Sequence, residues 1–519
     1  MEKIEWDDVQ GLLLSGYPQL THSAYMMWQF RPGQKNAART WLADLAGRLM
    51  RADSPRRGEQ HQLDTNGAAP NDIQALKSAS GSDLRAINLA LTASGLRKLE
   101  LDERRMAEFA LEFVEGMAPK TAADGEVPRR SNLLGDAGES SPERWWWGGW
   151  KDADVDGMLL LYAASPDSLQ ALIDAEIVAM ADACEVVVSS GPNSGEPVIV
   201  KGRLYDDLKE HFGFRDGISQ PTIEGSPMAK RSRERLKRKA AAPSEEEQGR
   251  VLSATEQRIS LVKPGEFVLG YPNERRECIE SQSAKAGNVR DLLRNGTYLV
   301  FRQLEQDVHG FEDFVTNLAV RLHGEATPEN TDDVAARVIG RKKSGEPLVP
   351  RAADSTKVIE RNDFLYSHED ASGMACPIGA HIRRANPRDV VGPDPDTALR
   401  LSKMHRIIRR GRPYGPRREP DEAKPNGKGS GRGIAFIALN ADIAGQFEMI
   451  QHSWLNNRHF GGLQIGTDPI GHVAQAEDEF TVQQRPANLH MRRSRPLVTV
   501  RGGAYFFMPG INAVRALAD

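Results

Sequence analysis

Two glycines in the segment 211–221 flank an aspartate that could do chemistry. Gly213 and Gly217 stand on either side of Asp216 in His-Phe-Gly-Phe-Arg-Asp-Gly-Ile-Ser-Gln-Pro. Because glycine has no side chain, the backbone around Asp216 can approach a bound molecule closely while presenting one carboxylate to it. A tight turn in which Asp216 caps the backbone explains the same residues, and on local chemistry it is the simpler interpretation.

A histidine followed by basic residues forms the second segment of interest. Arg383, Arg384 and Arg388 follow His381, which two small residues precede. A single histidine is commonly a structural residue, and the other eleven of the twelve histidines form no H-x-x-x-H pair, which argues against a zinc site. One imidazole beside a basic cluster instead suits a large anionic cofactor such as haem, with its two propionates.

A third segment, 405–415, is rich in arginine and reads His-Arg-Ile-Ile-Arg-Arg-Gly-Arg-Pro-Tyr-Gly. Arg409 and Arg410 directly precede Gly411, and a Pro-Tyr-Gly turn follows. Surface charge on an exposed loop explains this pattern equally well, so the segment alone does not indicate a site.

The elements that must position these segments alternate between strands and helices. In the first half, apolar runs predict strands over 24–30, 86–91, 157–162 and 185–189, and helical spacing predicts helices after the first strand, from residue 92 and over 168–180. The second half repeats the order, with strands over 298–302, 433–439 and 497–507 and helices over 311–322, 443–454 and at the C-terminus. This order is typical of the split β-α-β, or ferredoxin-like, unit. We therefore expect an α+β protein of two tandem ferredoxin-like domains, each an antiparallel sheet with helices.

Polar segments separate these elements. Residues 51–80 and 413–433 have the composition of loops. The basic run 230–239, followed by the acidic triplet 245–247, indicates a solvated insertion, and an arm for nucleic acid is the alternative. We expect an N-terminal domain over 1–225, a charged insertion over 226–260 and a C-terminal, cofactor-binding domain over 261–519.

Composition narrows the class of protein. The chain has 519 residues, and its 68 Lys and Arg against 72 Asp and Glu give a net charge of −4, which argues against a surface built for nucleic acid. No apolar run is long enough to span a membrane, and the acidic start lacks the features of a signal peptide. Cys184, Cys278 and Cys376 are too far apart for a disulfide framework or a C-x-x-C metal site, so we expect a protein of the reducing cytoplasm.

Taken together, the three segments resemble the dye-decolourising peroxidase family. The G-x-x-D-G signature of that family matches Gly213-Phe-Arg-Asp216-Gly217, its proximal segment matches residues 379–388, and its distal arginine segment matches residues 407–411. Further matches, at 265–271, 446–447, 454–456 and 466–470, extend the resemblance from about residue 9 to the C-terminus. The insertions look like those of the longer-loop subgroup. The resemblance implies two ferredoxin-like domains, with haem in the C-terminal one.

The resemblance also assigns roles around the cofactor. His381 would be the axial ligand of the iron of one haem b per chain, binding as neutral imidazole. A carboxylate on the other ring nitrogen would raise the basicity of the imidazole. Asp468 is the first choice for this carboxylate, Glu477 and Asp478 are weaker ones, and a turn or cap aspartate explains Asp468 nearly as well.

On the distal side, Asp216 would move a proton between the peroxide oxygens, and Arg409 would stabilise negative charge as the O–O bond breaks. Since an unperturbed aspartate has a pKa of about 3.9, such an enzyme should work best at low pH. Arg388 would pair with a propionate. Ile434 and Phe436, alternate residues of one strand, would face the distal pocket, or would otherwise be ordinary core residues.

The function implied is that of a haem peroxidase, which uses hydrogen peroxide to oxidise dyes, phenols or other organic donors through high-valent iron. Bulky donors cannot enter a closed haem pocket, so Tyr414 and the tryptophans of 145–150 are hypotheses for an electron relay, with ordinary packing the alternative. The runner-up is a haem- or porphyrin-handling protein with incidental peroxidase activity, and a non-haem scaffold is a third reading. We expect no nucleic-acid or membrane partner, and an oligomer is compatible with the sequence.

Overall fold

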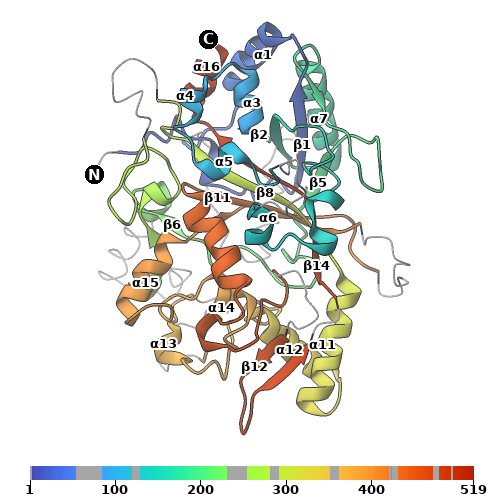
Figure 1. Cartoon of the computed structure of the whole chain (residues 1–519), viewed down its shortest axis with the longest axis vertical. Helices are drawn as coiled ribbons and strands as arrows, with labels where there is room; N and C mark the ends of the chain where they lie inside the picture. Colours follow the sequence, from blue (N-terminus) through green and yellow to red (C-terminus); the bar gives the residue numbers. More distant parts are fainter. Residues whose placement is uncertain are drawn as a thin grey trace.

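The strands of both halves of the chain form one ten-stranded antiparallel sheet (Figure 1). The structure is a computed structural model that describes residues 3–53, 84–119, 129–230, 254–280, 291–350, 362–419, 422, 431–471, 479–492 and 495–519. The loop predicted over 51–80 and the charged run 230–239 lie almost wholly outside the described residues. Within the described residues, no helix has the length and apolar character needed to cross a membrane.

The first half has the strand order of a ferredoxin-like unit. Its elements are β1 (His22–Phe30), α1 (Lys35–Arg48), β2 (Arg85–Leu91), β3 (Gly157–Ala163), α7 (Pro166–Met180) and β4 (Cys184–Val186). In the sheet these strands lie in the order β4-β1-β3-β2, with the first and third strands in the centre. All seven residues of β3 are buried, because both faces of the strand are covered, and this explains its unbroken apolar run.

The second half repeats this order. It contains β8 (Thr297–Gln306), α11 (Val308–His323), β9 (Ile408–Arg409), β11 (Gly433–Asn440), β14 (Val498–Met508) and α16 (Ile511–Ala518). The strands lie in the order β14-β8-β11-β9, the same arrangement of fourth, first, third and second strand. The predicted α+β fold of two tandem ferredoxin-like units is therefore confirmed.

The two units join edge to edge and share their core. β14 pairs with β2 through Phe507 and Leu91. At the other end, the short strand β10 (Arg412–Tyr414) pairs with β11 of the second half and with β5 (Ile199–Arg203) of the first, so the path of strands closes on itself. One buried apolar cluster accordingly contains Tyr25 of β1 and Phe301 of β8. The residue boundaries predicted for the domains stay a prediction.

Several local features differ from the sequence-based expectation. α7 begins at Pro166 with Ser165 as its cap, since the Ser165 side chain accepts from the amide of Ser168. β4 is shorter than predicted. The helix predicted over 443–454 consists of two π-helical stretches, η6 (Ile443–Glu448) and η7 (Ile450–Leu455). Pro413 and Tyr414, predicted to lie in a loop, belong to β10.

The remaining elements cover the sheet and its lower end. α16 packs beside α1, and α11, α12 and the β12–β13 hairpin lie at the opposite end of the molecule (Figure 1). The helices and strands whose bounds have not yet been given are α3 (Ala93–Lys98), α4 (Glu103–Met106), α5 (Leu111–Glu115), α6 (Arg129–Leu134), β6 (Thr222–Ile223), α9 (Ala254–Ser260), β7 (Leu261–Val262), α12 (Pro328–Ile339), α13 (Tyr366–Glu369), α14 (His381–Ala385), α15 (Pro395–Met404), β12 (Glu479–Val482) and β13 (Leu489–Arg492).

Candidate active site

His381 is the first residue of α14 and forms a pair with Asp468. Its Nδ1 lies 3.0 Å from Oδ2 and 3.2 Å from Oδ1 of Asp468, which is fully buried. The Nε2 atom has no hydrogen-bond partner among the described residues, and the side chain is 32% exposed. An imidazole with one nitrogen held by a carboxylate and the other open is the arrangement of a metal-ligating histidine.

The surroundings of Asp468 keep it ionised. Its Oδ1 accepts from the amide of Ile470 at 2.9 Å and from that of Gly471, and its own amide donates to Leu455 O. Burial alone would raise the pKa of Asp468, but the charge and hydrogen bond of His381, helped by the amide of Gly471, lower it to about 2. The structure thus brings Asp468 to His381 as predicted, whereas Glu477 and Asp478 lie outside the described residues.

Arg384, three residues after His381, braces the chain that carries Asp468. Its guanidinium donates to the carbonyls of Trp454 at 2.7 Å, Asn457 at 2.9 Å and Gly466 at 2.6 Å, and it lies over the ring of Phe460. These bonds tie α14 to the segment directly before Asp468. A basic residue beside the histidine is here a buried structural donor.

The second pair joins Asp216 to Arg409, 193 positions further along the chain. Arg409 Nε donates to Asp216 Oδ1 at 3.0 Å, Arg409 Nη2 forms an ion pair with the same oxygen at 2.9 Å, and the amide of Gly217 donates to it at 2.6 Å. Burial would raise the pKa of Asp216, but the charge and hydrogen bonds of Arg409 outweigh it and hold the pKa below its usual value. Both glycines around Asp216 have left-handed backbones, with φ of 90° at Gly213 and 86° at Gly217, so the motif needs glycine there.

Two residues that the sequence analysis did not assign hold this pair in place. Gln220 is buried; its Nε2 donates to Arg409 O at 2.9 Å, and its Oε1 accepts from Arg409 N at 3.1 Å. Glu210 accepts from the amides of Phe212 and Phe214 and from Gln306 Nε2, which shapes the loop before Asp216. Only their place next to the G-x-x-D-G motif could have pointed to them.

The register of the sheet places Ile434 and Phe436 on the face that carries Arg409. Arg409 of β9 lies opposite Ala438 of β11, and alternate residues of a strand point to the same face. Phe436 and Ile434 are partly exposed, whereas Ala435 and Ile437 between and beyond them are buried. The two predicted pocket residues thus share a partly open face with Arg409.

The two pairs act on each other electrostatically. The charge of Asp216 raises the pKa of His381 and that of Arg409 lowers it, while Asp468 and burial have the larger effects. In return, His381 contributes to lowering the pKa of Asp216. The Asp216–Arg409 pair and the His381–Asp468 pair therefore lie within electrostatic reach of each other.

Arg388 takes a structural role in the contacts that the structure describes. It is buried, lies 3.7 Å from the centre of the Phe364 ring, and its Nη1 donates to Asn362 O and Phe364 O, both at 2.7 Å. These bonds use one of its nitrogens on the main chain. Its predicted part in binding a propionate stays a prediction.

The predicted relay residues are mostly in the core. Trp145 Nε1 donates to Ser140 O and Trp147 Nε1 to Gln303 Oε1, each at 2.8 Å, and both rings are buried. Trp146 is partly exposed beneath Arg501, and Tyr414 is buried in β10. Packing accounts for their positions, and a relay stays a prediction.

The donor set of this site fits a haem. It offers one open imidazole nitrogen, a carboxylate on the other nitrogen, and a group of arginines, Arg388, Arg406 and Arg409, whose positive charges act on one another. A single neutral nitrogen ligand and an excess of buried positive charge suit an iron porphyrin that carries two carboxylates.

No protein-family model matches the chain. It is 28% identical over 470 residues to Peroxidase 2 of Mycetinis scorodonius, covering 85% of this chain and 78% of that protein. It is 29% identical over 458 residues to a dye-decolorizing peroxidase of Exidia glandulosa, covering 85% and 77%. The crystal structure of a dye-decolourising-type peroxidase of Auricularia auricula-judae superposes with a TM-score of 0.70 at 22% identity over the full length of both chains and shows that the fold is shared. The chain is thus similar in sequence, over most of its length, to dye-decolourising peroxidases, and it shares the fold of the solved peroxidases of that type.

Proposed function

We propose that the protein is a haem peroxidase that uses hydrogen peroxide to oxidise dyes, phenols or other organic donors, with one haem b per chain. The observation that carries the proposal is the Asp216–Arg409 pair within electrostatic reach of His381. A protein that only handles haem or porphyrin needs a ligand for iron but no acid–base pair beside it, so this pair favours the peroxidase.

When bound, the haem iron supplies the electron transfer that splits peroxide and oxidises the donor. His381 would ligate the iron through Nε2, because Asp468 holds the proton of Nδ1 and fixes both the tautomer and the direction of the ring. The same carboxylate makes the imidazole a stronger electron donor. Arg384 supports this pair from behind by fixing the carbonyl of Gly466, two residues before Asp468.

Asp216 would move the proton that peroxide cleavage requires. It takes a proton from one oxygen of hydrogen peroxide and returns it to the other, which leaves as water. Arg409 keeps the carboxylate ionised before this step through the hydrogen bond from Nε and the ion pair from Nη2 to Oδ1. Its Nη1, which has no partner among the described residues, is a donor for the negative charge that develops on the leaving oxygen.

Ile434 and Phe436 would limit access to the space beside Arg409. Both side chains belong to β11 and lie on the same face of the sheet as Arg409 of the neighbouring strand β9, and both are apolar and partly exposed. Small peroxide can pass such residues, whereas bulky dyes must deliver electrons from outside. Trp146 and Trp150 are the partly exposed members of the tryptophan cluster, so they are the residues of that cluster best placed to meet a donor. The proposed location is the cytoplasm, on the sequence features given above.

An absorption experiment tests this function. The haem-reconstituted protein should show a Soret band that changes on addition of about one equivalent of peroxide. His381→Ala should lose the band and Asp216→Ala should keep it but respond slowly, while His452→Ala, at an exposed histidine, should behave as the natural protein. A band that ignores peroxide would indicate haem handling instead, and no band at all would refute haem binding.

A further inference from the structure

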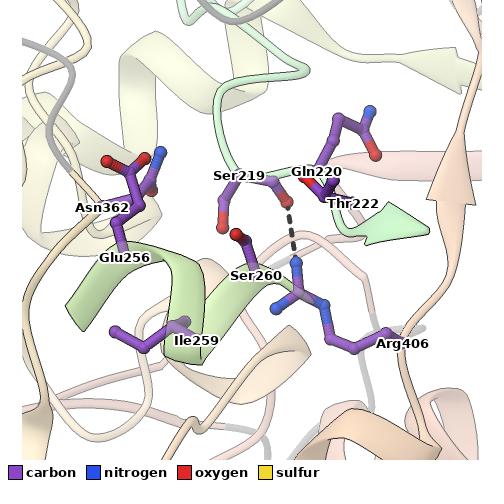
Figure 2. A pocket seen from close by; sticks show the side chains of 8 residues that line it. All are labelled: Ser219, Gln220, Thr222, Glu256, Ile259, Ser260, Asn362 and Arg406. Atoms are coloured by element: carbon purple, nitrogen blue, oxygen red, sulfur yellow. Dashed lines mark hydrogen bonds between the residues drawn. The ribbon is translucent and has the colours of Figure 1, made fainter. Parts of the chain in front are cut away.

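A small cavity next to the Asp216 loop is lined by a buried arginine. Figure 2 shows it between the loop at Ser219 and Gln220, helix α9 with Ser260, and Arg406, whose guanidinium points toward Ser219. Glu256 lies on the far side of the same cavity, beside Asn362 (Figure 2). The cavity has room for about one water molecule.

The charge of Arg406 has no counterion in the described part of the chain. The residue is 7% exposed. Among the residues that the structure describes, it forms no ion pair and donates one side-chain hydrogen bond, from Nη2 to Ser219 O at 3.2 Å. Burial, together with the like charges of Arg388 and Arg409, lowers the pKa of Arg406 to about 9. Burying an unpaired guanidinium is costly, and a protein that keeps one has an anion to place against it.

Arg388 is a useful contrast because it is equally buried but compensated. Its Nη1 donates to two main-chain carbonyls, and the negative charges of Glu256, Asp389 and Glu369 act on it favourably. No such acidic group acts on Arg406. Of these two arginines, Arg406 is therefore the one whose positive charge is available to bind an anion.

We propose that Arg406 is the main anchor for a carboxylate of the cofactor. The inference rests on the proposed haem function and adds to it a residue, three positions before Arg409, that the sequence did not single out. Arg406 lies close enough to Arg409 for their charges to interact, so one molecule could reach both. Since Glu256 lies across the cavity, the carboxylate is expected to approach from the side of Arg409.

Haem and its dimethyl ester, which lacks both carboxylate charges, distinguish this role. Binding of each to the haem-free full-length protein is followed by titration of the Soret band. The natural protein should bind haem about 10- to 100-fold more tightly than the ester, the range expected of charge-assisted hydrogen bonds. In Arg406→Gln most of this preference should disappear. Arg412→Gln is the matched control and should keep it, because Arg412 is a buried arginine that donates to the main-chain carbonyls of Gly16 and Tyr17 and has no place in the proposed site. An equal preference in Arg406→Gln and the natural protein would overturn the inference, while failure of the natural protein to bind either compound would instead refute the proposed function.

Thermal unfolding separates an anchor from a merely structural arginine. Because Arg406 is an uncompensated charge without ligand, Arg406→Gln should raise the melting temperature of the haem-free protein and reduce the increase that haem produces. Arg412→Gln should lower the melting temperature with and without haem, since it breaks bonds to the main chain. If Arg406→Gln does not fold, Arg406→Lys, which keeps the charge, provides the test: it should retain part of the preference for haem over the ester. A lower melting temperature in an Arg406→Gln protein that does fold, or no preference in Arg406→Lys, would contradict the role.

Discussion

The side-chain amide of Gln220 grips the main chain of Arg409 from both sides, donating to its carbonyl oxygen at 2.9 Å and accepting from its amide at 3.1 Å. Arg409 in turn contacts Asp216, four residues before Gln220, through its Nε and Nη2 groups. Main-chain and side-chain bonds thus join the two parts of the proposed distal site, the loop with Asp216 and Gln220 and the strand with Arg409. The geometry of an acid–base pair built from both halves of the chain depends on this cross-link.

Replacing Gln220 should therefore damage catalysis more than its distance from the chemistry indicates. Gln220→Met keeps the shape but leaves the amide of Arg409 without its partner and its carbonyl with only the 3.4 Å bond from Arg410 Nη1. This loss should cost about 1–3 kcal/mol of stability. The rate of the reaction with peroxide should fall about tenfold as Arg409 loses its position. Stopped-flow absorption and thermal unfolding measure the two effects.

Gln10→Met is the matched control for this experiment. Gln10 is buried and clamps the main chain in the same way, donating to Leu89 O and Pro509 O and accepting from Leu89 N. It should lose similar stability and leave the peroxide rate unchanged. Equal rates in the two variants would show that Gln220 acts on stability alone.

Removing the carboxylate of Asp216 tests the proton transfer itself. In Asp216→Asn the side chain keeps its size and can still accept a hydrogen bond from Arg409, but it cannot take up a proton. The rate with peroxide should fall about 10²- to 10⁴-fold, the usual contribution of a general base, while the Soret band and the melting temperature change little. A rate within a factor of about two of the natural protein would exclude Asp216 as the base.

The strands that the sequence predicted well are those with apolar residues on both faces. Residues of β3 and β11 are apolar without interruption or nearly so, and the length and composition of such runs separate them from helices. β10 has only three residues and one of them is proline, so no sequence pattern predicts this strand or its pairing with both halves of the sheet. The junction of β2 with β14 likewise depends on one residue pair.

The site divides in the same way between motif and context. The contacts of Asp216 with Arg409 and of His381 with Asp468 follow from motifs that stand out by residue type. The roles of Arg384 and Arg406 do not follow from a motif, because each lies close to other arginines and nothing in the sequence separates it from them. What distinguishes them is whether each N–H meets a carbonyl, as in Arg384, or an unfilled space, as in Arg406.

The acid limit of the reaction should move when Arg409 is removed. Arg409 holds the pKa of Asp216 below its usual value against the effect of burial. The base is therefore ionised over the working range and is lost only as the pH falls through this lowered pKa. In Arg409→Leu the charge and hydrogen bond that lower the pKa of Asp216 are lost, so this pKa rises and the acid limb of the rate–pH profile should shift to higher pH. Arg417→Leu, at a surface ion pair with Asp207, is the control and should leave the limb in place. An unmoved limb in Arg409→Leu would mean that another group sets it.

Asp468→Asn should weaken both the hold on haem and the electron donation of His381. The asparagine oxygen can still accept from the amides of Ile470 and Gly471, so its NH2 group would face Nδ1 of His381. Two donors cannot bond, and the ring then favours the tautomer with its proton on Nε2, which has no lone pair for a metal. Haem affinity should fall about 10- to 100-fold, and the iron(III)/iron(II) reduction potential should rise because the imidazole is less basic. Redox titration and Soret titration measure these changes. Asp370→Asn breaks a comparable buried bond, to Arg383 on the same helix as His381, and should lower stability without moving the potential. If both variants shift the potential equally, the effect comes from loosening α14, and the hydrogen bond between Asp468 and His381 is not its source.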